Sequence, residues 1–379
     1  MNELRNKNIL LISPEFWGEN FVSKHHYALE LSKRGNKVFF LNPPSWHWSF
    51  NIELSRISKN LYTIDYGIFL KGLNRFPFLL RSKVQVTLAR WIQGSLKTEF
   101  DIVWNFDPYR FQYLPCFGAN LNIYHSVDVY KTTLEKETAK CANIVFVTSD
   151  KILERLQDVE TPKFKINHGV AQHFFDECTD LFQQEEIPTR VKVGYIGNLL
   201  YKYLDVEILG IIIDNNKDVL FTFIGPYEKS NLHGGEYNLK FIEYLKCSAN
   251  VHILGPKPSN ELPRYLNQFD LFLMCYSGDR DVAEMANPHK ILEYLSTGKT
   301  VVSHYIDEYK DKKDLVEMVK HNRLLPQKLN HVLHNLNYFN SPEKAQLRRQ
   351  YALSNTYGKQ IARIEQLVSD YVYSDSNVN

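Results

Sequence analysis

Short apolar runs alternate with helix-spaced segments along most of the chain, and this alternation restricts the fold more than any other feature of the sequence. In the first half, the expected strands are the apolar runs at 8–12, 37–41, 101–104, 122–125 and 143–148. Helical spacing lies between them, over 21–33, 131–141 and 150–157. Strands that alternate with helices in this way predict a parallel sheet with helices on both faces.

The same alternation restarts near residue 190, which predicts a second domain. Its expected strands are 191–196, 219–224, 251–254, 269–276 and 299–303, and its expected helices are 203–213, 239–246, 259–267 and 289–296. We therefore expect an α/β fold of two facing, doubly wound, Rossmann-like domains. In such sheets ligands bind beyond the carboxyl ends of the strands, here in the cleft between the domains.

The domain boundaries follow from the same pattern. The first domain is expected over 1–175 and the second over 190–341. An acidic and polar segment, 176–189, lies between them and is predicted to be a linker. The remaining residues, 342–379, are predicted to form a helical tail that packs back towards the first domain.

Composition and charge exclude several classes of protein. Of the 379 residues, 44% are hydrophobic and 23% are charged, which excludes a disordered chain. Lys and Arg number 45 and Asp and Glu 43, so the chain has no global basic field and no nucleic-acid partner is expected.

The five cysteines include no C-x-x-C pair, which suits a reducing cytoplasm. No apolar run approaches the roughly 18 residues of a membrane span, and the first is too short for a signal peptide.

The strongest functional signal is the run from Asn287 to Ser303. Pro288 suits the first turn of a helix, whose N-terminus presents N–H groups and a positive dipole end to a phosphate. Lys290 adds a full positive charge, and Glu293 follows on the same helical face, where its carboxylate can accept hydrogen bonds from two ribose hydroxyls. Gly298 is expected to end the helix. The alternative is a capped amphipathic helix with an incidental Lys–Glu pair.

This run resembles the donor-nucleotide motif of glycosyltransferases with the GT-B fold, especially the family 4 group and its relatives in polysaccharide synthesis. The family pattern reads approximately P-x-K-[LIF]-x-E-Y-[LM]-A-x-G-[KLV]-P-V-V. The chain departs from it at Ser296 and Thr300 and matches it at Pro288, Lys290, Glu293, Tyr294, Leu295, Gly298, Lys299, Val301 and Val302. The resemblance implies that the second domain binds a nucleoside-diphosphate sugar, and that the first domain presents the acceptor.

A second signal follows two strands of the second half. Gly197 would let the backbone approach a diphosphate, and Gly225-Pro226 resembles the I-G-P turn of the family. Where many members carry Arg or Lys after the glycine, this chain has Asn198, with Lys202 nearby. The arrangement resembles teichuronic-acid and xanthan-type transferases. The expected donor-binding residues are thus Gly197, Asn198, Lys202, Gly225, Pro288, His289, Lys290 and Glu293.

The first half carries the candidate catalytic residues. Asp128 follows an expected strand, and similar inverting transferases place a proposed general base here, which takes the proton of the attacking hydroxyl. His125 is the alternative base. A purely structural alternative is that Asp128 caps a helix that begins near Lys131. A single base would favour inversion of the anomeric centre.

Residues 13–20 form a loop after the first strand. Related enzymes use this loop near the acceptor, so Trp17, Gly18 and His25 are predicted to bind acceptor, with Trp17 as a stacking surface. The alternative is a surface loop without a binding role.

No metal or other cofactor is expected. Asp279-Arg280-Asp281 is similar to the D-x-D motif of another transferase fold, but the lysine and the helix dipole already supply positive charge. Several family members have a second glutamate eight residues before the position of Glu293. This chain has Met285 there, with Glu284 one residue away, so the usual sugar contact is altered.

Residues 71–98 carry six basic residues, several aromatic and aliphatic residues, and no acidic residue. Such a segment can lie on an anionic membrane leaflet, and the aromatic run 43–50 could add an anchor. The alternative is an amphipathic helix packed on the first domain.

Together these features predict a cytoplasmic glycosyltransferase, peripheral on the inner face of the membrane, that acts on a glycan or lipid-linked acceptor in surface polysaccharide synthesis. The alternatives are a sugar-nucleotide epimerase on the same fold and a non-catalytic sugar-nucleotide-binding scaffold.

Overall fold

The computed structural model describes residues 4–18, 21–47, 51–68, 70–130, 132–176, 190–228, 238–277 and 287–373. The chain divides into two compact units. The first unit comprises Met1–His168 and Tyr357–Asn379, and the second comprises Gly169–Thr356. Most of the predicted linker lies outside the described residues, except Asp176, which ends the short helix α5 (His173–Asp176). No helix in the described ranges combines the length and hydropathy of a membrane span.

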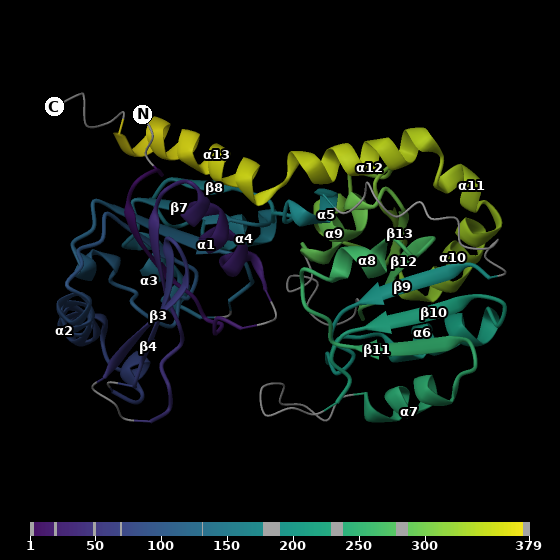
Figure 1. Ribbon diagram of the computed structural model, residues 1–379, viewed down its shortest axis with the longest axis horizontal. Coiled ribbons are helices and arrows are strands. Elements are labelled where there is room, and N and C mark those ends of the chain that lie inside the picture. Colours follow the sequence, from purple (N-terminus) through teal and green to yellow (C-terminus); the bar gives the residue numbers. More distant parts are fainter. Residues whose placement is uncertain are drawn as a thin grey trace. The chain divides into compact units, whose positions relative to one another are not determined.

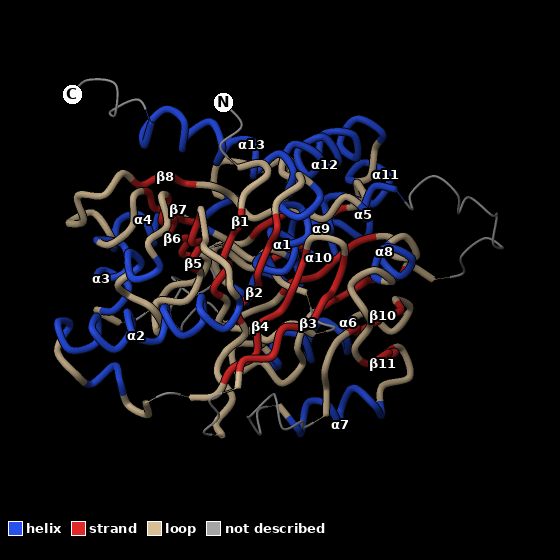
Figure 2. The backbone as a smooth tube through the Cα atoms, turned by 60° about the vertical axis from the view of Figure 1, so that its left-hand side comes forward, coloured by secondary structure: helices blue, strands red, loops and turns tan. Residues whose placement is uncertain are grey.

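The first unit contains an eight-stranded sheet in the order β3-β4-β2-β1-β5-β6-β7-β8. Its strands are β1 (Asn8–Ile12), β2 (Lys37–Leu41), β3 (Ile52–Ser58), β4 (Leu61–Tyr66), β5 (Ile102–Asn105), β6 (Leu121–Ser126), β7 (Ile144–Val147) and β8 (Lys163–Lys165). All neighbours pair in parallel except β3, which runs antiparallel to β4 at the edge of the sheet (Figure 2). The predicted strands are confirmed to within about one residue, but the sequence did not predict β3, β4 or β8.

Helices cover both faces of this sheet, as the alternation predicted. Successive residues of β1 point to opposite cores, Ile9 and Leu11 to one and Leu10 and Ile12 to the other. The first core is closed by α1 (Ser23–Lys33) and α13 (Tyr357–Val368), which contact each other (Figure 1). The second core is closed by α2 (Phe78–Leu96), α3 (Leu134–Lys140) and α4 (Asp150–Arg155).

The second unit contains a six-stranded, wholly parallel sheet in the order β11-β10-β9-β12-β13-β14. Its strands are β9 (Lys192–Ile196), β10 (Leu220–Ile224), β11 (Val251–Gly255), β12 (Leu271–Met274), β13 (Thr300–Ser303) and β14 (Glu317–Met318). One face packs against α6 (Val206–Asn215), α7 (Leu239–Cys247) and α10 (Leu325–His334). The other packs against α5, α8 (Leu262–Leu266), α9 (Lys290–Ser296) and α12 (Pro342–Ser354). Another short helix, α11 (Leu336–Phe339), follows α10.

The C-terminal helices are shared between the two units. Helix α12 packs on α9 in the second unit, whereas α13 packs on α1 in the first. Arg348 of α12 is buried and donates hydrogen bonds to the carbonyls of Gly298 and Phe339, and Arg349 donates to the carbonyl of Thr297. These cations satisfy the C-terminal end of α9, where the helix dipole is negative. The expected tail therefore has two packing partners instead of one.

Candidate functional site

Two glycine turns meet at the carboxyl ends of β9 and β10. Gly225 has φ +146°, and a Cβ atom added there would lie 1.9 Å from the carbonyl oxygen of Gly197. The amide of Gly197 donates to Ile224 O at 2.9 Å, and the amide of Leu199 donates to Pro226 O at 2.9 Å. Only glycine fits such a close backbone approach at this φ. The structure therefore brings together two of the predicted donor residues, Gly197 and Gly225.

Tyr294 joins α9 to these turns. Its buried hydroxyl accepts a hydrogen bond from Ile196 N at 2.8 Å and donates one to Ile196 O at 3.1 Å. Strands β9 and β12 pair only as far as Gly194 and Phe272, so β12 offers no hydrogen-bond partner to the backbone of Ile196. The Tyr294 hydroxyl supplies these partners instead. The tyrosine ring stacks on Phe272, with 4.3 Å between centroids. The motif helix and the glycine turn are thus held as one assembly, although about a hundred residues separate them.

Lys290 and Glu293 form an ion pair on the first turn of α9. Lys290 Nζ lies 3.1 Å from Glu293 Oε2, and Glu293 is 8% exposed. Pro288 was expected in the first helical turn, but α9 begins at Lys290, with His289 as its N-cap. Pro288 instead precedes the helix, and its carbonyl accepts from Ile291 N. Offsets of one or two residues at helix ends are common because terminal turns are irregular.

The remaining predicted donor residues lie in the loop between β9 and α6. Asn198 uses its side-chain oxygen to accept from Leu200 N at 2.9 Å, which stabilises the turn. Lys202 is exposed, and its ammonium lies 4.4 Å from the centroid of the Tyr203 ring. The loop ends at Asp205, which caps α6 and also accepts from Asn322 Nδ2 at 2.7 Å.

A buried histidine that no sequence pattern indicated, His304, directly follows β13. His304 accepts a hydrogen bond on Nδ1 from Tyr276 N at 3.4 Å, and burial lowers its pKa to about 4. Within the described part of the chain, its Nε2 has no hydrogen-bond partner. The ring is therefore neutral at physiological pH and packs beside the end of β12.

Two predictions about metals and carboxylates fall outside the described residues. These are the Asp279-Arg280-Asp281 triplet and the Glu284–Met285 position. Among the residues that the structure does describe, no group of three His, Cys, Asp or Glu side chains is placed to hold a metal ion.

In the first unit, Asp128 follows β6 and lies beside Lys24 of α1. Lys24 Nζ is 3.7 Å from Asp128 Oδ2 and 3.0 Å from Glu15 Oε1. The lysine is buried, whereas the Asp128 side chain is 65% exposed. Helix α3 begins at Leu134, with Thr133 as its N-cap, so the alternative that Asp128 caps this helix is wrong. Asp128 is therefore an accessible carboxylate at the carboxyl end of the sheet.

A second carboxylate, that of Glu135, contacts the loop of Asp128 through the hydroxyl of Ser126. Ser126 Oγ lies 2.6 Å from Glu135 Oε1 and 3.2 Å from the carbonyl of Asp128. Glu135 is 1% exposed, and burial raises the pKa of its carboxyl. Sequence spacing did not single out Glu135, because its role depends on a contact between β6 and α3.

His125, the alternative base, lies inside the core. It is fully buried among aromatic rings, with Phe106 at 5.0 Å and Tyr27 at 5.2 Å between centroids. Burial lowers its pKa well below the usual value. Neither ring nitrogen has a hydrogen-bond partner among the described residues. His125 is thus enclosed between the sheet and its covering helices, whereas the Asp128 side chain is exposed.

Most of the residues predicted to bind acceptor instead make contacts that stabilise the loop after β1. His25 donates from Nε2 to Phe16 O at 3.0 Å and accepts on Nδ1 from Val22 N at 3.2 Å. Trp17 is half-buried, and its ring lies 5.0 Å from that of Phe40. Gly18 is exposed. The Trp17 ring therefore packs on the core instead of presenting an open stacking surface.

Arg110 is a further polar centre that sequence reasoning missed. Its guanidinium donates to Asp107 Oδ2 at 2.6 Å, to Asn42 O at 2.7 Å, to Tyr66 OH at 3.2 Å and to Ser13 O. These partners follow or end β5, β2, β4 and β1. One side chain thus ties together four strand ends, and no local sequence pattern announces such a role.

Comparisons with known proteins support the fold. No family model matches the chain, and no curated protein sequence matches it. Among solved structures, a sucrose-phosphate synthase from Thermosynechococcus elongatus aligns with a TM-score of 0.72 at 12% identity, covering 97% of this chain and 100% of that one. A trehalose-6-phosphate structure from E. coli bound with UDP-2-fluoro glucose aligns with a TM-score of 0.68 at 10% identity, covering 95% and 98%. An α,α-trehalose 6-phosphate synthase from Burkholderia multivorans aligns with a TM-score of 0.65 at 12% identity, covering 98% of each chain. The chain has the GT-B fold, with two Rossmann-like domains.

Proposed function

We propose that this protein is a glycosyltransferase that moves a sugar from a nucleoside-diphosphate donor to a hydroxyl group of an acceptor. The observation that carries the proposal is the assembly of α9, Tyr294 and the two glycine turns at the carboxyl end of the second sheet. This is where α/β sheets bind ligands, and the run over α9 resembles a donor-nucleotide motif. The E. coli structure of similar fold is bound with UDP-2-fluoro glucose, which supports a donor of the same chemical class.

Lys290 and Glu293 are assigned to the donor. Lys290 contacts the diphosphate, while Glu293 accepts hydrogen bonds from hydroxyls of the ribose or the sugar. Donor binding then exchanges the ion pair within α9 for contacts to the ligand. The leaving diphosphate gains negative charge as the glycosidic bond breaks, and preorganised positive charge from Lys290 and Lys202 stabilises that change.

Asp128 is assigned as the general base. It takes the proton of the acceptor hydroxyl, the hydroxyl oxygen bonds to the anomeric carbon, and the bond from that carbon to the donor diphosphate breaks. Exposure leaves the carboxylate open to the acceptor, while Lys24 and the Ser126–Glu135 pair position it. One base and direct displacement give inversion at the anomeric carbon.

The finer assignment rests on resemblance. The motifs resemble family 4 and the teichuronic-acid and xanthan-type transferases, and this resemblance supports the proposal that the reaction belongs to surface polysaccharide synthesis on a glycan or lipid-linked acceptor. We further propose a peripheral position on the inner leaflet, which the basic and apolar residues of 71–98 support. An epimerase would need only the donor site. A scaffold would bind the donor whether or not Asp128 is replaced, and it would catalyse no transfer in either form.

The donor site is tested by thermal unfolding with UDP, GDP, ADP and CMP. A ligand at 100 times its dissociation constant stabilises the fold by about 2.7 kcal/mol. At least one diphosphate should shift the wild-type melting temperature, and Glu293→Ala should abolish that shift. The matched control is Glu207→Ala, which removes an exposed carboxylate from the first turn of α6 in the same unit. No shift with any nucleotide, or an equal shift in the Glu293 variant, would contradict the donor site.

A further inference from the structure

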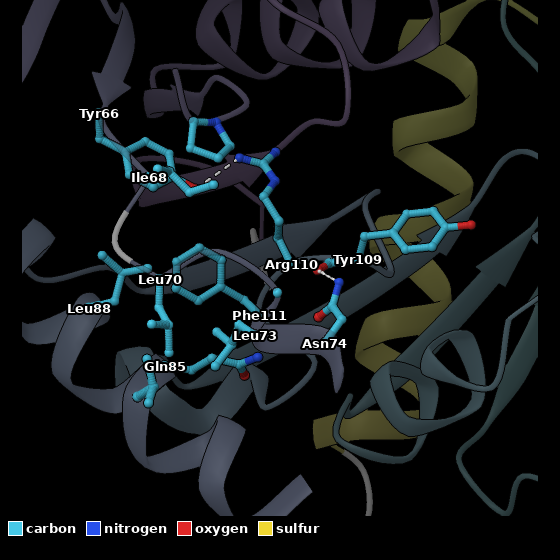
Figure 3. A pocket seen from close by; sticks show the side chains of 13 residues that line it. Tyr66, Ile68, Leu70, Leu73, Asn74, Gln85, Leu88, Tyr109, Arg110 and Phe111 are labelled. Atoms are coloured by element: carbon cyan, nitrogen blue, oxygen red, sulfur yellow. Dashed lines mark hydrogen bonds between the residues drawn. The ribbon is translucent and has the colours of Figure 1, made fainter. Parts of the chain in front are cut away.

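A cavity of about 210 Å³ opens at the carboxyl ends of β2, β4 and β5 in the first unit. Its walls come from the segments after these strands, from the turn at 70–74 and from one face of α2 (Figure 3). The apolar side chains of this lining are Pro44, Ile68, Leu70, Leu73, Val84, Leu88 and Phe111. The cavity is separate from the donor residues, which belong to the second unit.

The polar groups of the lining already have partners within the protein. Arg110 is bound to four strand ends, as described above. Asn74 Nδ2 donates to Tyr109 O at 3.0 Å, and Gln85 Nε2 donates to Gln112 Oε1 at 2.7 Å. A ligand that enters therefore meets apolar walls and polar groups that are already satisfied. Apolar cavities of about 150 Å³ bind small hydrocarbons such as benzene, so this cavity suits a hydrocarbon group.

Exposed apolar side chains also occur in the segment that supplies the cavity lining. Leu70 lines the cavity and is itself 38% exposed, and Phe76, Leu79 and Leu80 are 46%, 75% and 52% exposed. Exposed apolar clusters of this kind mark binding sites in soluble domains.

Exposed basic residues alternate along the chain with the lining residues 70–74 and with the start of α2. Lys71, Arg75 and Lys83 are exposed and form no ion pair with any acidic residue that the structure describes. Arg81 differs, since it is buried and paired with Glu137. An apolar cavity behind a cationic rim is complementary to a molecule with a hydrocarbon chain and an anionic head.

The cavity also adjoins the loop of the candidate base. The Tyr109 ring, from the cavity lining, lies 5.9 Å from the Tyr130 ring in an edge-to-face contact. Tyr130 is two residues beyond Asp128, and its hydroxyl donates to Phe106 O at 3.2 Å. An acceptor held by its chain in the cavity can therefore extend its head group along Tyr109 and Tyr130 towards Asp128.

We infer that this cavity binds the hydrocarbon chain of an anionic, single-chain amphiphile that serves as the acceptor. The inference rests on the proposed function, because it identifies the chemical class of the acceptor. The anionic group lies at the cavity rim near Lys71 and Arg75, and the acceptor hydroxyl beyond it extends along Tyr109 and Tyr130 towards Asp128.

Isothermal titration calorimetry with decyl phosphate below its micellar concentration tests the inference. The wild type should bind decyl phosphate, and Leu73→Trp should weaken binding about tenfold or more because the larger side chain fills the space of several methylene groups. Leu347→Trp, on the exposed face of α12 in the second unit, is the matched control and should bind as the wild type does. The double variant Lys71→Gln, Arg75→Gln leaves the cavity intact and should weaken decyl phosphate but not decyl maltoside, which has the same chain without the charge.

Three outcomes would overturn the inference: equal binding by wild type and Leu73→Trp, equal binding of inorganic phosphate, or binding of phosphatidylglycerol vesicles without binding of decyl phosphate. The last result would assign the surface to a membrane instead of an acceptor chain. Titration of UDP, GDP and ADP into the same samples separates the two proposals. If one of UDP, GDP and ADP binds and decyl phosphate does not, the cavity assignment fails and the donor site stands. If decyl phosphate binds and none of these nucleotides does, the donor site fails instead.

Discussion

The carboxyl ends of the two sheets are built differently, although both sheets belong to α/β units of the same kind. In the second unit, the strand ends are joined by backbone contacts, with Gly225 against Gly197 and Tyr294 bonded to both backbone groups of Ile196. In the first unit, they are joined by one long side chain, Arg110, and next to it lie an exposed carboxylate and an apolar cavity. A site fixed by backbone contacts suits a ligand of constant shape, and an open one suits a ligand that varies.

The difference also separates two kinds of carboxylate. Glu293 is buried against Lys290 on a helix, where its position is fixed. Asp128 lies in a loop with most of its surface open to solvent. Under the proposed function, Glu293 would recognise the donor and Asp128 would contact the acceptor that arrives from solvent. Substitutions at the strand ends of the second unit should therefore lower the unfolding free energy more than substitutions at Asp128.

The largest expected effect is that of Gly225→Ala. The added Cβ would meet a backbone oxygen at 1.9 Å, and φ +146° is strained for any other residue. We expect a loss of roughly 3 kcal/mol in unfolding free energy, measured by urea denaturation. In the first unit, Gly18→Ala meets its nearest atom only at 4.0 Å, and should change stability by less than about 0.5 kcal/mol. Equal losses of unfolding free energy for the two substitutions would contradict the proposed difference between the carboxyl ends of the two sheets.

The next largest effect is expected for Tyr294→Phe, which removes the hydroxyl that binds Ile196. Leaving those buried backbone groups without partners should cost about 2 kcal/mol and weaken nucleotide binding. The matched control is Tyr309→Phe, because the buried hydroxyl of Tyr309 has no partner within the described ranges. That variant should be as stable as the wild type and bind nucleotide normally. If Tyr294→Phe left both the unfolding free energy and nucleotide binding unchanged, the hydrogen bonds between Tyr294 and Ile196 would not position the donor site.

Acid should destabilise both units through buried histidines, His25 and His125 in the first unit and His304 in the second. Burial lowers the pKa of His125 in the first unit, and it lowers that of His304 in the second to about 4. The unfolded chain takes up protons near pH 6.5 and the folded chain does not, so this stability is complete above pH 6.5 and is lost as the pH falls towards the folded pKa. Each histidine contributes a slope of up to about 1.4 kcal/mol per pH unit in that window.

Urea denaturation at pH 7.5, 6.5 and 5.5 measures this slope. His125→Phe should reduce the slope of the first unit, where His25 keeps its own contribution, and His304→Asn should remove that of the second. A slope that stays unchanged in both variants would contradict the assignment to these histidines.

The smallest structural effect is expected for Asp128→Asn. An exposed side chain with one ion-pair partner at 3.7 Å contributes little, so unfolding free energy should change by less than about 0.5 kcal/mol. Nucleotide binding should be unaffected, yet transfer should fall by roughly 10²-fold or more, because a general base is lost. Glu160→Gln, at an exposed position of the same unit, should leave transfer unchanged. Full transfer by Asp128→Asn would exclude the base role.

Much of the fold was predictable because its signals are local. Strands β1 and β2 were predicted at their observed bounds, since each is an apolar run closed by Pro or Gly residues. The helix over α9 and the turn at Gly197 were predicted from motifs that carry their own chemistry. Their connection through Tyr294 was not, because it joins residues far apart in the sequence.

Other features depend on tertiary contacts alone. Strand β3 was missed because its side chains are largely exposed and show no strict alternation of apolar and polar residues. His125 looked like a catalytic candidate because sequence does not reveal that β6 ends one residue beyond it, at Ser126, with helices covering both faces of the strand. Arg110 gave no signal, since its partners come from four separate segments.

A nucleotide bound at the carboxyl end of the second sheet should slow amide exchange there. Hydrogen–deuterium exchange measured with and without UDP, GDP and ADP detects this. For a nucleotide that binds, we expect added protection at 195–205 and 287–297 and unchanged exchange at 124–130. Protection confined to the first unit, with none over α9 or the glycine turns, would contradict this donor site.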